Sequence, residues 1–380
     1  SKDIGVEFAP DSEITASATL AITSDDADQP QVNVSLTGKG VLARDGIWIS
    51  AEELSSLPMS GWAWEDLKKE ADAVPDRQPM SKLAGDHDTQ TLAIGLVYAR
   101  TGEEFYRGKA LTEIDWAMGT EEGSAQAVGP CRNVVSYIIT ADLIDLENYD
   151  PAFDANFRKW IDEMRFVIWP DGSFIDEDDE RTNNHGRMCG AARVAIAVYL
   201  DDREDLKKAA RVFEGLLGDR DAYDEFIWKD DLSWQADEMN PVGVNPVGAV
   251  KQGLNIDGAL PEEMRRGKPS GVFAIPPDHT GYPWEALQGM LVEAVMLERA
   301  GYYEVFDWSD QAILRIVEFI ERLALEFDDD LEPGLTWWAT GDDRWVPWVI
   351  NSIYDTDFEC EEASHGKLMA WTDWTHAPCY

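Results

Sequence analysis

The stretch NHGRMCGAARVAIAVYL, residues 184 to 200, is the clearest helix signal in the chain. It is apolar on nearly every side, so the helix that it predicts should be covered by other parts of the protein. Gly186 and Gly190 lie four residues apart and would give this helix a small face for close packing. By contrast, REDLKKAARVFEGLL at 203 to 217 carries a polar stripe and suits an outer layer. Alternating buried and half-exposed helices predict a mainly α fold, an (α/α) toroid of helical hairpins, with a simple helical bundle as the alternative.

Local signals bound the other helices. Residues 89 to 100 are periodically apolar and end before Gly102, a typical C-cap glycine. Asp150 and Pro151 form an N-cap followed by a first-turn proline. Further helices are predicted at 105 to 118, 131 to 146, 283 to 300 and 309 to 326. The stretch 218 to 282 is irregular but rich in aromatic residues, which is typical of a loop that lines a site.

The first 43 residues have a different pattern, with three alternating runs separated by turn-forming residues. The runs are IGVEFAP at 4 to 10, ASATLAITSD at 16 to 25 and QVNVSLTGKG at 31 to 40. Alternation predicts one buried face per strand, formed by Ala18, Leu20, Ile22, Val32, Val34 and Leu36.

These runs resemble the last strands of the immunoglobulin-like modules of secreted and surface proteins. The resemblance implies a β segment at 1–43, a helical domain at 44–380 and a longer, multimodular extracellular protein. The alternative is an N-terminal sheet packed on the main domain. The opening SKDIGVEFAP is neither basic nor apolar, so no signal peptide is expected there.

The composition restricts the partners. The 74 acidic residues face 32 basic ones, which gives a formal charge of −42 and argues against nucleic acid as a partner. Hydrophobic content of 44% and 16 tryptophans exclude a disordered chain, and no apolar run is long enough for membrane insertion. An anionic substrate would therefore need a local cationic site. The oligomeric state is not predicted.

The four cysteines are Cys131, Cys189, Cys360 and Cys379, and they lack the paired spacing of a zinc site. Three disulfide pairings are possible. Cys360 and Cys379 enclose a short loop and could staple the end of the chain, while free buried thiols remain the alternative.

Two separate elements carry a second resemblance. Asn183, Asn184 and His185 stand at the mouth of the apolar helix. The later element consists of Asp257, Gly258, Pro261, Glu263, Arg266, Gly267, Tyr282, Ala286 and Leu287. In this order the two elements resemble the alginate lyases with a helical toroid fold, and their relatives that act on other uronate polymers.

That resemblance implies a polysaccharide lyase that cleaves an anionic, uronic acid-containing polymer by β-elimination. Asn184 and Arg266 would neutralise the uronate carboxylate through amide and guanidinium donors. His185, with an ordinary pKa of ~6.5, would be the base. Tyr282 would protonate the leaving oxygen, or serve as both base and acid. The scheme needs no metal and no other cofactor.

One departure from the family pattern is the insertion GKPSGVFAIPPDHTG between Arg266 and Tyr282. It contributes His279, an alternative acid or base, and would alter the subsite. The other candidates for substrate contact are Asn183, Arg132, Asn133 and Trp234, with Arg193 as a further lone charge in an apolar helix.

Each of these residues also has a structural interpretation. His185 could cap or pack its helix, Tyr282 could be a hydrophobic staple, and Arg132, Asn133 and Arg193 could form buried polar contacts. Trp228, Trp234, Trp284, Trp337, Trp338 and Trp345 could stack on sugars, although most tryptophans in such a chain should be core.

Two other function classes stay open. A glycoside hydrolase on a similar toroid could use paired carboxylates such as Asp86 and Asp88. A surface or matrix protein could bind the polysaccharide without cutting it. In all three cases the expected location is extracellular, secreted or at the cell surface.

Overall fold

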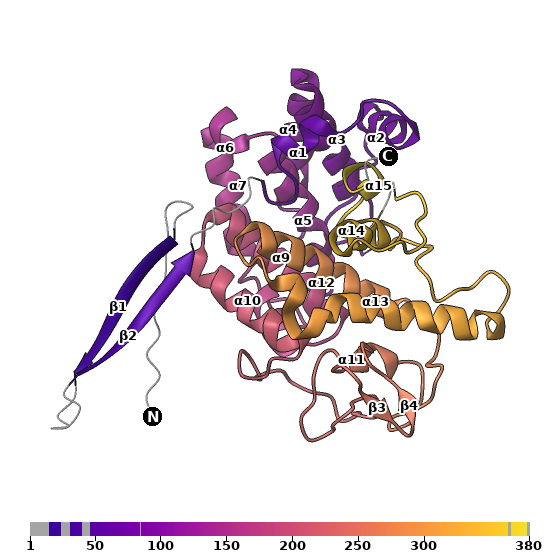
Figure 1. Ribbon diagram of the computed structural model, residues 1–380. Coiled ribbons are helices and arrows are strands. Elements are labelled where there is room, and N and C mark those ends of the chain that lie inside the picture. The colour runs from indigo at the N-terminus through magenta and orange to yellow at the C-terminus, as the bar shows by residue number, and fades with distance from the viewer. Residues whose placement is uncertain (1–14, 24–30, 40–45, 84, 364–365, 378–380) are drawn as a thin grey trace. The chain divides into compact units, whose positions relative to one another are not determined.

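The computed structural model describes the chain except for residues 1–14, 24–30, 40–45, 84, 364–365 and 378–380. The chain divides into two compact units, Ser1–Arg44 and Asp45–Tyr380. Figure 1 shows a two-stranded ribbon in the first unit and a helical assembly in the second.

The first unit contains β1, Thr15–Thr23, paired antiparallel with β2, Gln31–Lys39. The register places Leu20 opposite Val34 and Ile22 opposite Val32, so the apolar side chains share one face as predicted. However, Ile22, Val32 and Val34 are 36%, 43% and 40% exposed, so the prediction that this face is buried is wrong. Two strands supply no second layer within the described part of this unit. The strand expected at 4 to 10 lies outside the described residues.

The second unit is built around four helices that are buried on nearly every side. They are α3 His87–Thr101, α5 Val128–Leu143, α9 Asn184–Leu200 and α12 Tyr282–Arg299. In this order each packs on the next. The mainly α fold is thus confirmed, and the most apolar predicted helix lies in the inner layer.

Half-exposed helices alternate with the inner ones along the chain and pack on their outer sides (Figure 1). They are α4 Glu104–Ala117, α7 Pro151–Met164, α10 Arg203–Leu217 and α13 Trp308–Phe327. The shorter helices are α1 Ala51–Ser56, α2 Trp62–Asp72, α6 Leu146–Tyr149, α8 Phe174–Glu180, α11 Pro261–Met264, α14 Trp345–Tyr354 and α15 Thr372–Thr375, with 3₁₀ turns at Val305–Asp307 and Asp328–Asp330.

The C-terminal segment, which contains α14 and α15, contacts both the first and the last of the four inner helices, α3 and α12. The indole of Trp345 in α14 donates to Gln288 of α12 at 3.1 Å. The indole of Trp371 donates to the carbonyl of Thr89 in α3 at 2.9 Å. The inner helices and this segment therefore form a closed ring, which is the arrangement expected of a helical toroid.

The predicted helix ends are confirmed where a specific cap was named. Asp150 caps α7 by accepting from the backbone N–H of Phe153, with Pro151 in the first turn. Gly102 ends α3 in the left-handed conformation, with φ 70°. Gly186 allows close packing, because a Cβ there would lie 2.1 Å from the carbonyl oxygen of Arg181.

One disulfide joins two inner helices, Cys131 of α5 and Cys189 of α9. Cys360 has a free thiol, which is the alternative to a staple between Cys360 and Cys379. The Cys360 thiol instead accepts a hydrogen bond from the Asn351 amide. Cys379 itself lies outside the described residues.

Charged side chains are also buried between α9 and the helices α8 and α10. Arg193 of α9 pairs with Asp178 at 3.0 Å and with Asp205 at 2.7 Å. The guanidinium is engaged in these buried ion pairs. Arg193 therefore has a structural role, which was the alternative to substrate contact.

The stretch from 218 to 282 contains little regular structure, as predicted, with β3 Val250–Lys251 paired to β4 Leu254–Asn255 and the single turn α11. It shares a small, separate apolar core with α13, in which Trp234 contacts Phe273 and, on α13, Phe319. Among the described residues, no helix has the length and apolar character required to cross a membrane.

Candidate active site

The site is organised by the first turn of α9. Asn183 is the N-cap residue, and its side-chain oxygen accepts from the backbone N–H of Gly186 at 3.3 Å. This contact satisfies one of the free N–H groups at the helix start. Asn183 is therefore a capping residue that fixes the position of the two residues after it, Asn184 and His185.

Asn184 is held on three sides by residues that are distant in sequence. Its backbone N–H donates to the carboxylate of Glu263. Its side-chain amide donates to Glu285 Oε2 at 2.7 Å and accepts from Arg266 Nη2 at 3.3 Å. The amide is buried, and its oxygen faces the guanidinium.

Arg266 and Tyr282 lie together despite the insertion between them. The Arg266 guanidinium is 4.1 Å from the centroid of the Tyr282 ring, and its Nε is 3.3 Å from Glu263 Oε2. An ion pair between Lys268 and Asp278 holds the two ends of the insertion close to each other. The structure therefore brings Asn184, Arg266 and Tyr282 into one cluster.

Glu285, in the first turn of α12, lies beside Asn184 and contacts two positively charged side chains. Its carboxylate is 3.3 Å from Arg132 Nη2 and accepts from Lys367 Nζ at 2.8 Å. Burial by itself would raise the pKa of Glu285, but Lys367, Arg132 and the Asn184 amide lower it. Arg132, a predicted contact residue, thus lies beside Asn184.

Glu285 and Lys367 were missed by the sequence analysis. Glu285 lies three residues after Tyr282 and could have been noticed as its helical neighbour. Lys367 is an isolated lysine near the C-terminus with no motif around it, so no local signal points to it.

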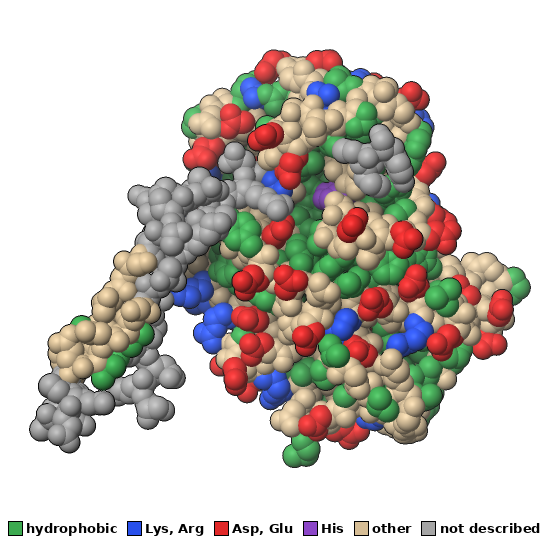
Figure 2. Space-filling view, in the orientation of Figure 1, with side chains coloured by type: hydrophobic (Ala, Val, Ile, Leu, Met, Phe, Trp, Pro, Cys, Tyr) green, Lys and Arg blue, Asp and Glu red, His purple; other side chains and the backbone are tan. Residues whose placement is uncertain are grey.

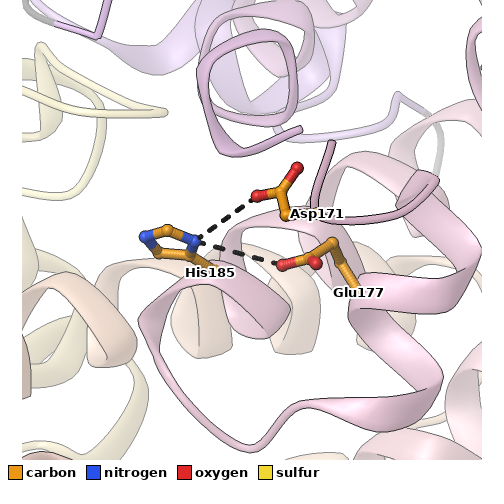
Figure 3. A group of neighbouring side chains, drawn as sticks. All are labelled: Asp171, Glu177 and His185. Carbon is orange, nitrogen blue, oxygen red and sulfur yellow. Dashed lines mark ion pairs between the residues drawn. The ribbon is translucent and has the colours of Figure 1, made fainter. Parts of the chain in front are cut away.

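His185 faces two carboxylates (Figure 3). Its Nδ1 is 3.9 Å from Asp171 Oδ2 and 4.0 Å from Glu177 Oε2, and Nε2 points away from both. Burial lowers the pKa of His185, and the charge of Arg181 lowers it further. Burial raises the pKa of Glu177 to about 8. The ring is therefore neutral at neutral pH, as a general base must be.

Three predicted contact residues do not join the cluster. Trp234 is 1% exposed, so it offers no face to a sugar, and its assignment to substrate contact is wrong. Asn133 is buried, and its amide donates to the carbonyls of Met80 and Gly129, which makes its role structural. His279 is exposed on the insertion, where its ring lies 4.9 Å from that of Trp337.

Of the other tryptophans considered, Trp284, Trp337 and Trp345 are buried, as expected of core residues. Asp88, one of the two carboxylates considered for a hydrolase, is buried in α3. Burial raises the pKa of Asp88 to about 8.

The surface around the helical unit is acidic, as the composition implies. On the face shown in Figure 2, acidic side chains are spread throughout and basic ones are scattered among them. The grouping of Arg132, Arg266 and Lys367 around Asn184 and Glu285 is therefore a local departure from the overall charge.

The helical unit thus gathers an amide, a guanidinium and a phenol near one inner helix, with an imidazole on the same helical turn as the amide. Residues 65–225 match the family model for alginate lyase, which supports the resemblance to that family. The matched segment includes Asn184 and His185 and ends before Arg266 and Tyr282. No curated protein matches the chain.

Proposed function

We propose that this protein cleaves a uronic acid-containing polymer, either alginate or a related glucuronan, by β-elimination. The observation that carries the proposal is the convergence of Asn184, Arg266 and Tyr282 from three separate segments, with His185 next to Asn184 on the same helical turn. The alginate lyase match over 65–225 supports the class of reaction.

The first step removes the proton on C5 of the uronate. The C5–H group is a weak acid because the adjacent carboxylate is already negative. Hydrogen bonds from the Asn184 amide and the Arg266 guanidinium would disperse the charge that develops on the carboxylate. Glu263 and Glu285 hold these two groups next to each other before substrate binds.

His185 would take the C5 proton at Nε2. Asp171 and Glu177 lie on the Nδ1 side, which favours a proton on Nδ1 and leaves Nε2 with a free electron pair. The C5–H electrons then form the C4–C5 double bond and the bond from C4 to the glycosidic oxygen breaks. Tyr282 would give its phenolic proton to that oxygen.

We also infer that the protein works outside the cytoplasm. The disulfide between Cys131 and Cys189 supports this, since such bonds persist in oxidising compartments.

The test is incubation with polymannuronate, polyguluronate, glucuronan and a neutral glucan, while following the ultraviolet absorbance of unsaturated uronates. The proposal expects new absorbance on at least one uronate polymer and a loss of about 10²- to 10⁴-fold in rate for His185→Ala. Reducing ends released without that absorbance would indicate a hydrolase. Binding without cleavage of any uronate polymer, by a folded protein, would indicate a binding protein and sink the lyase assignment.

A further inference from the structure

Two carboxylates lie close to His185, although no hydrogen bond joins them to its ring. Asp171 comes from the turn before α8, Glu177 from α8 and His185 from α9. One ligand atom from each of the three residues lies within 4.8 Å of the other two. Figure 3 shows all three directed toward the same space.

The facing atoms lack hydrogen-bond partners among the described residues. These atoms are Asp171 Oδ2, Glu177 Oε2 and His185 Nδ1. Glu177 is the decisive case, because its side chain is 1% exposed and its Oε2 points at the imidazole without a donor. A buried polar atom left without a partner is costly, so its retention calls for a partner that the protein side chains do not provide.

The remaining contacts hold the group in place. Asp171 Oδ1 accepts from the backbone N–H of Ala127 at 2.8 Å. Glu177 Oε1 is 3.0 Å from Arg181 Nε, and the same arginine donates to the carbonyl of Asp171 at 3.1 Å. Asp171 thus has one oxygen hydrogen-bonded to the backbone, and Glu177 has one oxygen in an ion pair with Arg181, while the other oxygen of each carboxylate faces His185. Such contacts to the outer side of a ligand are usual around metal sites.

We propose that Asp171, Glu177 and His185 bind one divalent transition-metal cation of the zinc type, through Oδ2, Oε2 and Nδ1. The separations of 3.9 and 4.0 Å from Nδ1 are too long for hydrogen bonds. Zinc bonds are about 2.0–2.2 Å long, so an ion between the atoms spans up to about 4 Å, and small side-chain shifts complete the geometry. One imidazole and two carboxylates leave a coordination position open for water or a substrate oxygen.

A bound cation would change the role of His185 in the reaction. This effect rests on the proposed lyase function, whereas the binding of the cation does not. A ring that binds the ion through Nδ1 carries its proton on Nε2, whereas the proposed base needs Nε2 free. The cation and the Nδ1 proton therefore compete for one nitrogen, and the loaded protein would hold His185 as a ligand in place of a base.

Binding is tested directly, so the result does not depend on lyase activity. Chelator-treated protein is titrated with Zn²⁺ by calorimetry, and with Co²⁺ by its visible absorption, in about 0.5 M salt to screen the acidic surface. We expect one site per chain, weakened at least about tenfold by Glu177→Gln and by Asp171→Asn.

Two control variants exclude other sources of binding. Glu180→Gln removes an exposed carboxylate from the same helix α8, and Cys360→Ser removes the free thiol. Both should bind as the unaltered protein does. Circular dichroism checks the folding of each variant, and Asp171→Asn serves if Glu177→Gln fails to fold.

Absence of a stoichiometric site would overturn the proposal, as would a site unaffected by both Glu177→Gln and Asp171→Asn. In the first case the buried carboxyl of Glu177 is neutralised by a proton of its own and not by a metal ion. Either result would leave the lyase assay to decide the proposed function independently.

Discussion

The guanidinium of Arg266 lies over the ring of Tyr282, 4.1 Å from its centroid, while also donating to the side-chain oxygen of Asn184. One positive charge is thereby shared between the proposed carboxylate-binding amide and the proposed proton donor. The contact ties the irregular stretch to the start of α12, although residues 267 to 281 separate the two side chains in sequence.

Replacing Arg266 with lysine should reduce kcat/KM on the preferred uronate polymer by about 100-fold. Lysine keeps the charge but loses the planar set of donors that reaches Asn184 and Glu263 while stacking on Tyr282. Steady-state kinetics measure the effect. Arg265→Lys is the matched control. Arg265 is adjacent to Arg266 in sequence but pairs with Glu262, so this variant should retain its activity.

Glu285→Gln should lower KM for an anionic substrate several-fold in dilute buffer. Its carboxylate is charged and offsets Arg132 and Lys367, so removing it makes the site more positive. The gain should shrink in about 0.5 M salt. Glu361→Gln, which alters a carboxylate paired with Arg344, provides the comparison. An unchanged KM at low salt would mean that Glu285 does not influence substrate binding.

Removing the disulfide with Cys131→Ala and Cys189→Ala should destabilise the helical unit by about 4 kcal/mol. The bond closes a loop with a sequence separation of 58 residues and joins two buried helices, so its loss increases the entropy of the unfolded chain. Denaturant unfolding, with and without a reductant, measures the difference. Cys360→Ser, which touches only a free thiol, should unfold as the original protein does.

Asp88→Asn should stabilise the protein at alkaline pH. The folded pKa of Asp88 is about 8, because burial raises it, whereas the unfolded value is ~3.9. Folding therefore takes up a proton between these values, and the contribution of Asp88 to stability declines as pH rises through about 8. An amide avoids this loss.

Thermal unfolding at about pH 5 and pH 9 tests this prediction, since the variant's advantage should be larger at the higher pH. Asp115→Asn changes an exposed carboxylate on α4 and is the control. Equal melting temperatures for Asp88→Asn and the original protein at both pH values would contradict the assigned shift.

Local chemistry was sufficient to predict most of the helices. The helix starting at Asp150 and Pro151, the end at Gly102 and the span 203 to 217 were all predicted from residues that act on their own neighbours. The buried face of the N-terminal strands was predicted wrongly, because alternation identifies which side is apolar but not whether another layer covers it.

Within the site, the sequence pointed to Asn184, His185, Arg266 and Tyr282 through motif and order. It did not distinguish Arg132, which reaches Glu285, from the adjacent Asn133, which is bound to backbone carbonyls. Successive residues on a helix point in different directions, so only the packing decides which of them meets the site.

The sequence by itself determined the helical class, the caps and the identity of the candidate chemical groups, because these depend on side chains and on neighbours a few residues away. Only the tertiary structure decided that Glu285 and Lys367 join Asn184, that Cys131 pairs with Cys189, and that Asp171 and Glu177 enclose the Nδ1 side of His185. These contacts join segments far apart in the chain, and their free energy comes from burial within the closed ring of helices, which no local sequence pattern specifies.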